Sequence, residues 1–190
     1  MSNMKIYVLI FLIFMSVFTS MIIEYIKKWN YKNGVYSAFA NDNKSLYDRL
    51  GGIFAISMVV NRFSDQMKFN PTVGINSPNP YLRDWWINKS ETSLPGLKWM
   101  RTLWVADVSG GPYKYVPTKS INGNASLNLE TAHCPLHITS LDFDEAANEL
   151  AKALDYYKVP NKEKMEVLSA FSGHKKEVIM GANIKVCPFA

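Results

Sequence analysis

The chain has 190 residues, a hydrophobic fraction of 48% and a formal net charge of +5, which leaves room for one ordinary domain and a short appendage. The positive charges are scattered and form no basic stripe interleaved with aromatic residues, which argues against nucleic-acid binding. Two cysteines, Cys134 and Cys187, are too few for a disulfide framework, and no CxxC or CxxCH spacing is present to hold a metal or attach a haem covalently.

An uncharged apolar run covers residues 6–23. As a helix continued through Ile26 it would be about 27 to 31 Å long, which is enough to cross the hydrocarbon core of a bilayer. The alternative is a cleaved signal peptide, which has a shorter apolar region and a small-x-small cleavage site. Bulky residues follow without a break from Met21, so the pattern favours an uncleaved single-span anchor.

We therefore predict an integral, single-pass membrane protein with its anchor at residues 1–29, which contacts membrane lipid through residues 6–26. Lys27 and Lys28 close the apolar run. By the positive-inside rule, the following domain would lie on the cytoplasmic side or, for the mitochondrial inner membrane, on the matrix side.

The rest of the chain is predicted to be all-α. Residues 30–44 are polar and are typical of a linker. Five later segments carry apolar side chains at helical spacing or end at Gly or Pro, and predict helices over residues 45–50, 53–68, 97–108, 141–158 and 161–180. Residues 74–95 and 113–128 are predicted to be irregular, and residues 181–190 to be a tail. No pair of strands and no repeat is indicated.

Two of the three histidines, His133 and His137, lie four residues apart just before a strongly helical segment. A histidine at the end of a short helix, facing an apolar pocket, is typical of the proximal ligand of a haem iron. The alternative is a core or helix-terminal histidine with a hydrogen-bonded partner. The spacing alone favours this alternative, because lone histidines are common and HxxxH without a central Glu is not a zinc-protease signature.

Seven short motifs occur in one order along the domain. They are Leu46-Tyr47-Asp48-Arg49-Leu50-Gly51-Gly52, Val59-Val60 with Phe63, Asn70-Pro71, Gly110-Gly111-Pro112 with Tyr115, Ala132-His133 with Leu136 and Ile138, Phe143, and Val159-Pro160. In this order they resemble the truncated haemoglobins of the first group, over residues 45–180. The resemblance implies a two-over-two helical sandwich, and it makes His133 the match to the proximal haem ligand.

The positions that match the family's distal pocket are changed. Ser64 stands where the family has the tyrosine that hydrogen-bonds bound oxygen, and Asn76 stands where it has a phenylalanine that packs on the haem. Arg101 replaces a glutamine that contacts the ligand, and Leu97 belongs to the same region. A guanidinium cannot be neutralised, so Arg101 in an apolar pocket would need a carboxylate or a haem propionate.

Extra residues lie between Pro71 and Leu97 and between Tyr115 and His133. They could supply Trp85, Trp86 or Tyr115 to fill the pocket from protein. In that case His133 would be hydrogen-bonded to protein or solvent.

Two functions remain open. We favour a globin-like accessory subunit of a membrane complex, such as a mitochondrial respiratory or ATP synthase assembly, with a degenerate haem site, no cofactor and no enzymatic activity. The alternative is a truncated haemoglobin that binds haem b through His133 and binds oxygen or detoxifies nitric oxide. No nucleophile–base pair, carboxylate pair or phosphate loop indicates hydrolytic or transfer chemistry.

Overall fold

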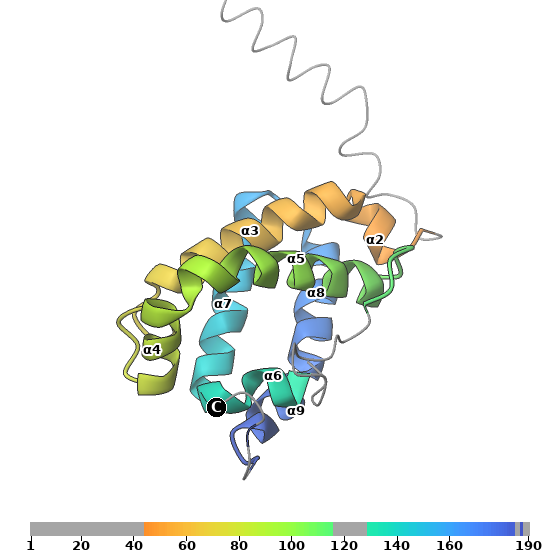
Figure 1. Cartoon of the computed structure of the whole chain (residues 1–190). Helices are drawn as coiled ribbons and strands as arrows, with labels where there is room; N and C mark the ends of the chain where they lie inside the picture. Colours follow the sequence, from red (N-terminus) through yellow and green to blue (C-terminus); the bar gives the residue numbers. More distant parts are fainter. Residues whose placement is uncertain (1–43, 116–128, 185–186, 188–190) are drawn as a thin grey trace, which may run out of the picture. The chain divides into compact units, whose positions relative to one another are not determined.

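The structure, a computed structural model, describes residues 44–115, 129–184 and 187. The chain divides into two units, residues 1–41 and 42–190, and all described residues belong to the second. The described part of the chain is helical and contains no strand (Figure 1). Its elements are α2 (Leu46–Arg49), α3 (Gly52–Phe69), α4 (Pro80–Asn88), α5 (Ser90–Val108), α6 (Leu129–His133), the 3-10 helix η2 (Cys134–Leu136), α7 (Ser140–Tyr156), α8 (Asn161–Gly173) and α9 (Lys175–Gly181).

Both predicted glycine turns are present. Gly51, with φ +90°, and Gly52, with φ +78°, adopt the left-handed conformation that glycine reaches without steric cost between α2 and α3. Gly110, with φ +83°, follows α5 in the same way. At Gly111 a Cβ atom would lie 2.5 Å from the Tyr47 ring and 2.6 Å from the Ala106 carbonyl oxygen. The second turn therefore packs directly on α2.

The segment predicted to be irregular before residue 97 is largely helical. Asn79 caps α4, since its side-chain oxygen accepts hydrogen bonds from the backbone N–H groups of Tyr81 (3.1 Å) and Leu82 (3.4 Å). Pro80 occupies the first turn of α4, where a missing N–H costs nothing. The prediction was wrong because it treated each proline as a helix breaker, whereas Pro95 lies inside α5.

The helix predicted over residues 161–180 is interrupted. α8 ends at Gly173, and α9 begins at Lys175 after His174, which caps both helices. The predicted helix over residues 141–158 is confirmed as α7, which begins with a capping box between Thr139 and Asp142.

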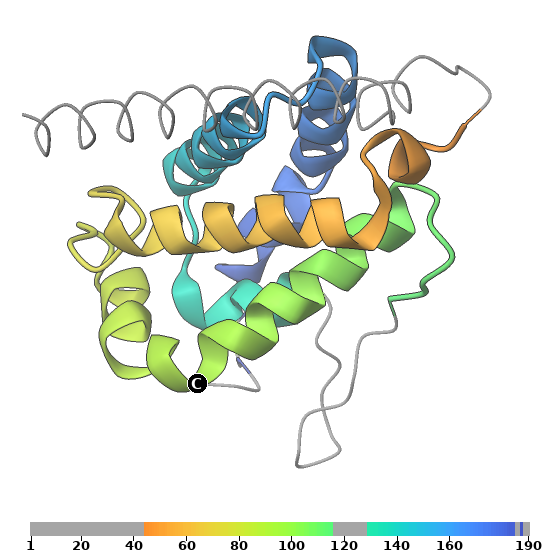
Figure 2. The same cartoon turned by 90° about the horizontal axis from the view of Figure 1, so that it is seen from above.

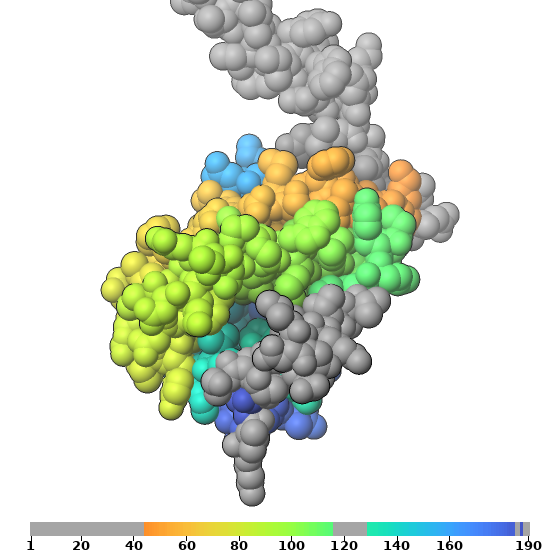
Figure 3. Space-filling model, viewed as in Figure 1, coloured from red at the N-terminus to blue at the C-terminus, as the bar shows by residue number. Residues whose placement is uncertain are grey.

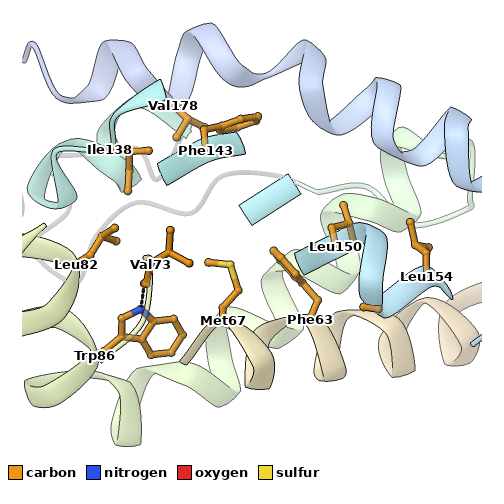
Figure 4. Close-up of a cluster of buried hydrophobic side chains, with 11 residues drawn as sticks. Phe63, Met67, Val73, Leu82, Trp86, Ile138, Phe143, Leu150, Leu154 and Val178 are labelled. Atoms are coloured by element: carbon orange, nitrogen blue, oxygen red, sulfur yellow. Dashed lines mark hydrogen bonds between the residues drawn. The ribbon is translucent and has the colours of Figure 1, made fainter. Parts of the chain in front are cut away.

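The helices form two layers. α3 and α5 run side by side, and this pair crosses α7 and α8 (Figures 1 and 2). The core between the layers contains Phe63 and Met67 from α3, together with side chains of α4, α7 and α9 (Figure 4). The remaining members of this buried cluster are Val73, Leu82, Trp86, Ile138, Phe143, Leu150, Ala153, Leu154 and Val178. The predicted all-α fold is confirmed by this arrangement.

The short helix α6 lies at the end of α7 and packs against α9. At Gly181, near the end of α9, a Cβ atom would lie 2.5 Å from the Glu130 carbonyl oxygen and 3.1 Å from the Cys134 backbone nitrogen. Only a residue without a side chain permits this approach. The absence of a side chain at Gly181 therefore allows α9 to pack closely against α6.

A disulfide joins Cys134 to Cys187, with a Cα–Cα distance of 5.8 Å. The two residues are 53 positions apart, and nothing in this spacing indicated the pairing. Cys134 is 2% exposed and directly follows α6. The bond therefore ties residue 187 to the end of the helix that carries His133.

The predicted localisation as a single-pass membrane protein is not supported, and we withdraw it. Across residues 44–115 and 129–184, no helix combines the length and the apolar character that a bilayer crossing requires. The run at residues 6–23 on which the prediction was based lies outside the described residues.

Candidate functional site

His133 is the last residue of α6, as the sequence predicted, and its imidazole is held by the backbone of its own helix. Its Nδ1 lies 2.7 Å from the carbonyl oxygen of Leu129. A carbonyl oxygen can only accept, so Nδ1 carries the hydrogen and donates it. Nε2 is therefore the nitrogen with a free lone pair, and no other protein group in the described part of the chain hydrogen-bonds this ring.

The surroundings of His133 favour the neutral imidazole. Burial lowers the pKa of His133, and the positive charge of Arg101 lowers it further, while the hydrogen bond to Leu129 opposes both. A neutral imidazole with a fixed tautomer is the form that binds metal ions. The Nδ1 hydrogen bond and the lowered pKa together leave the Nε2 lone pair of His133 available.

Ser64 and Arg101, two of the predicted distal-pocket residues, are brought together by the packing of α3 on α5. Arg101 Nη1 donates a hydrogen bond to Ser64 Oγ at 3.0 Å. The Ser64 side chain is fully buried, and the guanidinium carbon lies 5.4 Å from the centroid of the Phe63 ring. Burial lowers the pKa of Arg101 to about 10, so the guanidinium still carries its charge at neutral pH.

The other two predicted residues are placed differently. Leu97 is partly buried on α5, one turn before Arg101. Asn76 is exposed in the turn before α4 and does not join Ser64 and Arg101. Its neighbour Ile75 packs against the core instead.

The aromatic residues that were expected to fill the pocket are engaged elsewhere. Trp86 donates its Nε1 hydrogen to the Val73 carbonyl oxygen at 2.6 Å, as the dashed line in Figure 4 shows. Trp85 packs edge-on against Trp86. The backbone nitrogen of Tyr115 donates to Asp107. Among the described residues, no aromatic ring packs on His133.

Three features of the site were not predicted. The Leu129 carbonyl oxygen accepts a hydrogen bond from the His133 ring. Gly181 allows α9 to approach α6 closely, and Cys134 forms a disulfide with Cys187. The first has a sequence signal, because residues i and i−4 of a helix face each other and a histidine four residues after Leu129 can bond its carbonyl. The other two depend on contacts between distant segments and have no local signal.

Comparison with known proteins gives a family and a fold. Residues 45–179 match the family described as bacterial-like globin. No relative is found among curated proteins. The 2/2 haemoglobin of Synechococcus sp. PCC 7002, in the cyanomet state with covalently attached haem, is 22% identical with a TM-score of 0.56, over 72% of this chain and 99% of that chain.

Two further solved structures are similar to this chain. The truncated haemoglobin of Tetrahymena pyriformis in its Fe(III) form is 20% identical, with a TM-score of 0.57 over 72% of this chain and 98% of that one. The haemoglobin of the thermophilic phototrophic bacterium Chloroflexus aurantiacus is 20% identical, with a TM-score of 0.52 and the same two coverages. At these identities the likeness shows a shared fold.

These findings correct two sequence-based expectations. No cofactor was expected, but the family is a globin family and the similar structures are haemoglobins, so that expectation is wrong. An accessory subunit of a membrane complex was favoured over a haem-binding globin, and nothing in the family or the fold supports that preference. The wrong step was to take changed residues at the distal positions as evidence against haem. The match over residues 45–179 shows that this chain belongs to the bacterial-like globin family.

Proposed function

We propose that this chain is a haem-binding truncated globin, with His133 Nε2 as the proximal ligand of the haem iron. The observation that carries the proposal is the hydrogen bond from His133 Nδ1 to the Leu129 carbonyl oxygen, 2.7 Å long. It fixes the tautomer, directs the lone pair of Nε2 away from α6, and makes the imidazole a better donor.

The residues present fit a haem. Ferric or ferrous haem needs one neutral axial nitrogen from the protein, and His133 is held in that form. Leu129 and Leu136 flank this histidine in sequence and both pack against the apolar core. Bound haem would supply an iron coordination position for a small ligand such as oxygen or nitric oxide.

Two groups of residues have different roles. On the proximal side, α9 and the disulfide support α6, so that His133 keeps its position. Ser64 on α3 and Arg101 on α5 are joined by a hydrogen bond. Neither is a carboxylate or an imidazole, so these two residues supply hydrogen-bond donors and no general base at neutral pH.

The proposal is tested by adding haemin to the purified full chain and recording the absorption spectrum. We expect a Soret band in the wild type and its loss or strong weakening in His133→Gly. Free imidazole should restore the band in His133→Gly, because it can occupy the vacated ligand position. A purely structural role for His133 would not be rescued in this way.

The matched control is His137→Asn. His137 is exposed, has φ +47° and packs on the Tyr81 ring, and asparagine tolerates the left-handed conformation. This variant should bind haem like the wild type. A wild-type protein that binds no haem, or a His133→Gly variant with an unchanged spectrum, contradicts the proposed function.

A further inference from the structure

The helix that carries His133 is too short to keep its position by itself. α6 has five residues, and the 3-10 helix η2 that follows it directly has three. Helices shorter than about 12 residues are marginal in water unless packing supports them. The position of the His133 imidazole relative to the rest of the domain therefore depends on the contacts that brace this segment.

Two noncovalent contacts brace it. The Asn79 side chain, at the start of α4, donates hydrogen bonds to the carbonyl oxygens of Leu136 at 3.1 Å and His137 at 3.2 Å. The end of α9 packs on the backbone of His133 itself, because a Cβ atom added at Gly181 would lie 3.3 Å from the His133 carbonyl carbon. The contact with α9 therefore supports His133 directly.

The disulfide closes this second contact into a ring. Hydrogen-bonded turns continue past α9 to Ile184, whose backbone N–H donates to the Gly181 carbonyl oxygen at 3.1 Å. Cys187 follows shortly afterwards and is bonded to Cys134, the residue after His133. The end of α9 is thus held against His133 by packing at one point and by a covalent bond at another.

The two sulfur atoms differ in their access to solvent. Cys134 is 2% exposed, whereas Cys187 is partly exposed, and side chains of α9 are visible at the surface in Figure 3. An external thiolate would therefore attack the Cys187 sulfur and release the Cys134 sulfur. Cys134 Sγ lies 3.2 Å from the Thr131 carbonyl oxygen, so the released thiol can donate its hydrogen within its own helix. Both redox forms are thereby accommodated at this position.

We propose that the Cys134–Cys187 disulfide is a thiol-responsive redox site that controls how firmly the chain retains haem. This inference rests on the proposed haem-binding function. The reductant is a dithiol, which forms a mixed disulfide with Cys187, displaces the Cys134 sulfur and then closes its own disulfide to release Cys187. Two electrons and two protons convert the protein disulfide into two thiols. With the bond open, α9 is held against His133 by noncovalent contacts alone, and haem dissociates faster.

The coupling acts in both directions. If the disulfide raises the affinity for haem by some factor, bound haem raises the equilibrium constant for forming the disulfide by the same factor. We expect a factor of about ten, which lies within the usual range for coupled sites. For a two-electron couple this corresponds to about 30 mV. The reduction potential of the disulfide should therefore be about 30 mV lower in the haem-loaded chain than in the haem-free chain.

The first experiment measures haem loss from the full chain. The haem-loaded protein is used oxidised, or reduced with dithiothreitol and desalted without oxygen, and haem transfer to an acceptor globin is followed by absorption. We expect the reduced chain to lose haem about tenfold faster. Cys187→Ser should lose haem at the rate of the reduced wild type, and dithiothreitol should not change that rate.

The second experiment measures the reduction potential without relying on any variant. The haem-free and haem-loaded chains are equilibrated in mixtures of oxidised and reduced dithiothreitol, and their free thiols are counted. Equal potentials for the two chains overturn the inference, even if Cys187→Ser fails to fold.

Two further variants separate a local effect from a general loss of stability. Arg49→Ala removes the buried ion pair between α2 and α8, so it should destabilise the fold but lose haem at nearly the wild-type rate under conditions where it is folded. In His133→Gly with free imidazole, the iron ligand is no longer part of α6. The oxidised and reduced forms of this variant should therefore lose haem at the same rate.

The outcomes distinguish the inference from the proposed function. A normal Soret band with equal haem loss from the oxidised and reduced wild type overturns the inference and leaves the function standing. Haem loss from Arg49→Ala as fast as that from Cys187→Ser assigns the effect to general stability and also overturns the inference. A wild-type chain that takes up no haem overturns the proposed function and the inference together.

Discussion

Arg49 on α2 and Glu163 on α8 form a buried ion pair, with 2.5 Å between Nη1 and Oε1 and side chains that are only 8% and 2% exposed. The second guanidinium nitrogen bonds Glu166 on the same helix. This contact joins α2 to α8, which is one of the two helices of the second layer. It connects residues 114 positions apart.

We predict that Arg49→Ala destabilises the domain by about 3–5 kcal/mol, because it leaves the Glu163 carboxylate buried without a partner. The measurement is urea denaturation followed by circular dichroism. The control is Lys164→Ala, which removes an ion pair between Lys164 on α8 and the exposed Asp155 on α7 and should cost less than about 1 kcal/mol. Equal effects of the two substitutions would contradict the role assigned to Arg49.

A second prediction concerns the support of the His133 helix by α9. Gly181→Ala would place a Cβ atom 2.5 Å from the Glu130 carbonyl oxygen, so either α6 or α9 must move. We expect a lower melting temperature and weaker haem binding, measured by haem transfer to an acceptor globin.

Gly173→Ala serves as the matched control, since nothing lies within 4 Å of its added Cβ atom. This second substitution should be neutral or should stabilise by about 0.4–1 kcal/mol, as alanine restricts the unfolded chain at compatible positions. Equal effects of the two glycine substitutions on the melting temperature and on haem binding would show that the close approach of α9 to α6 contributes to neither.

The third prediction concerns the disulfide between Cys134 and Cys187. Cross-linking residues 53 positions apart restricts the unfolded chain and, in the chain-entropy model, stabilises the fold by about 4 kcal/mol. Cys187→Ser should therefore lower the melting temperature measured by calorimetry, and reductant should lower that of the wild type but not of the variant. Two reactive thiols in the native wild-type protein, titrated without reductant, would contradict the pairing.

A fourth prediction concerns Asn70, a buried residue in the Asn70-Pro71 motif that ends α3. Its side-chain nitrogen donates to Glu145 at 2.7 Å and to Glu149 at 2.8 Å, and its oxygen accepts from the backbone nitrogen of Thr72 at 2.8 Å. The hydrogen bond from Asn70 is the largest of the effects that lower the pKa of Glu145. Asn70→Ala should therefore destabilise the domain, by about 1–3 kcal/mol for the buried groups left unpaired.

The effect of Asn70→Ala on the unfolding free energy should depend on pH, because the pKa of Glu145 is lowered in the folded protein. A carboxyl group with a lowered pKa in the folded state stabilises the fold above its unfolded pKa, and this contribution is lost as the pH falls through the folded value. The difference in unfolding free energy between wild type and Asn70→Ala should thus be larger at pH 7 than at pH 3. A difference that stays constant across this range would assign the whole effect to the backbone contact with Thr72.

The sequence by itself determined several of the helices and the position of His133 at the end of one of them. The apolar spacing in α3 and α7, the glycine turns at Gly51-Gly52 and Gly110, and the histidine that ends α6 are local features. Each depends on side-chain spacing or backbone conformation within a few residues, which is the information that a sequence carries directly.

Only the tertiary structure shows which distant residues pack around these local features. Only packing places Ile75 against the core and leaves Asn76 exposed. The pairs Arg49–Glu163, Cys134–Cys187 and Ser64–Arg101 join residues 114, 53 and 37 positions apart. Such contacts depend on how α3 and α5 cross α7 and α8, and no local pattern encodes that crossing.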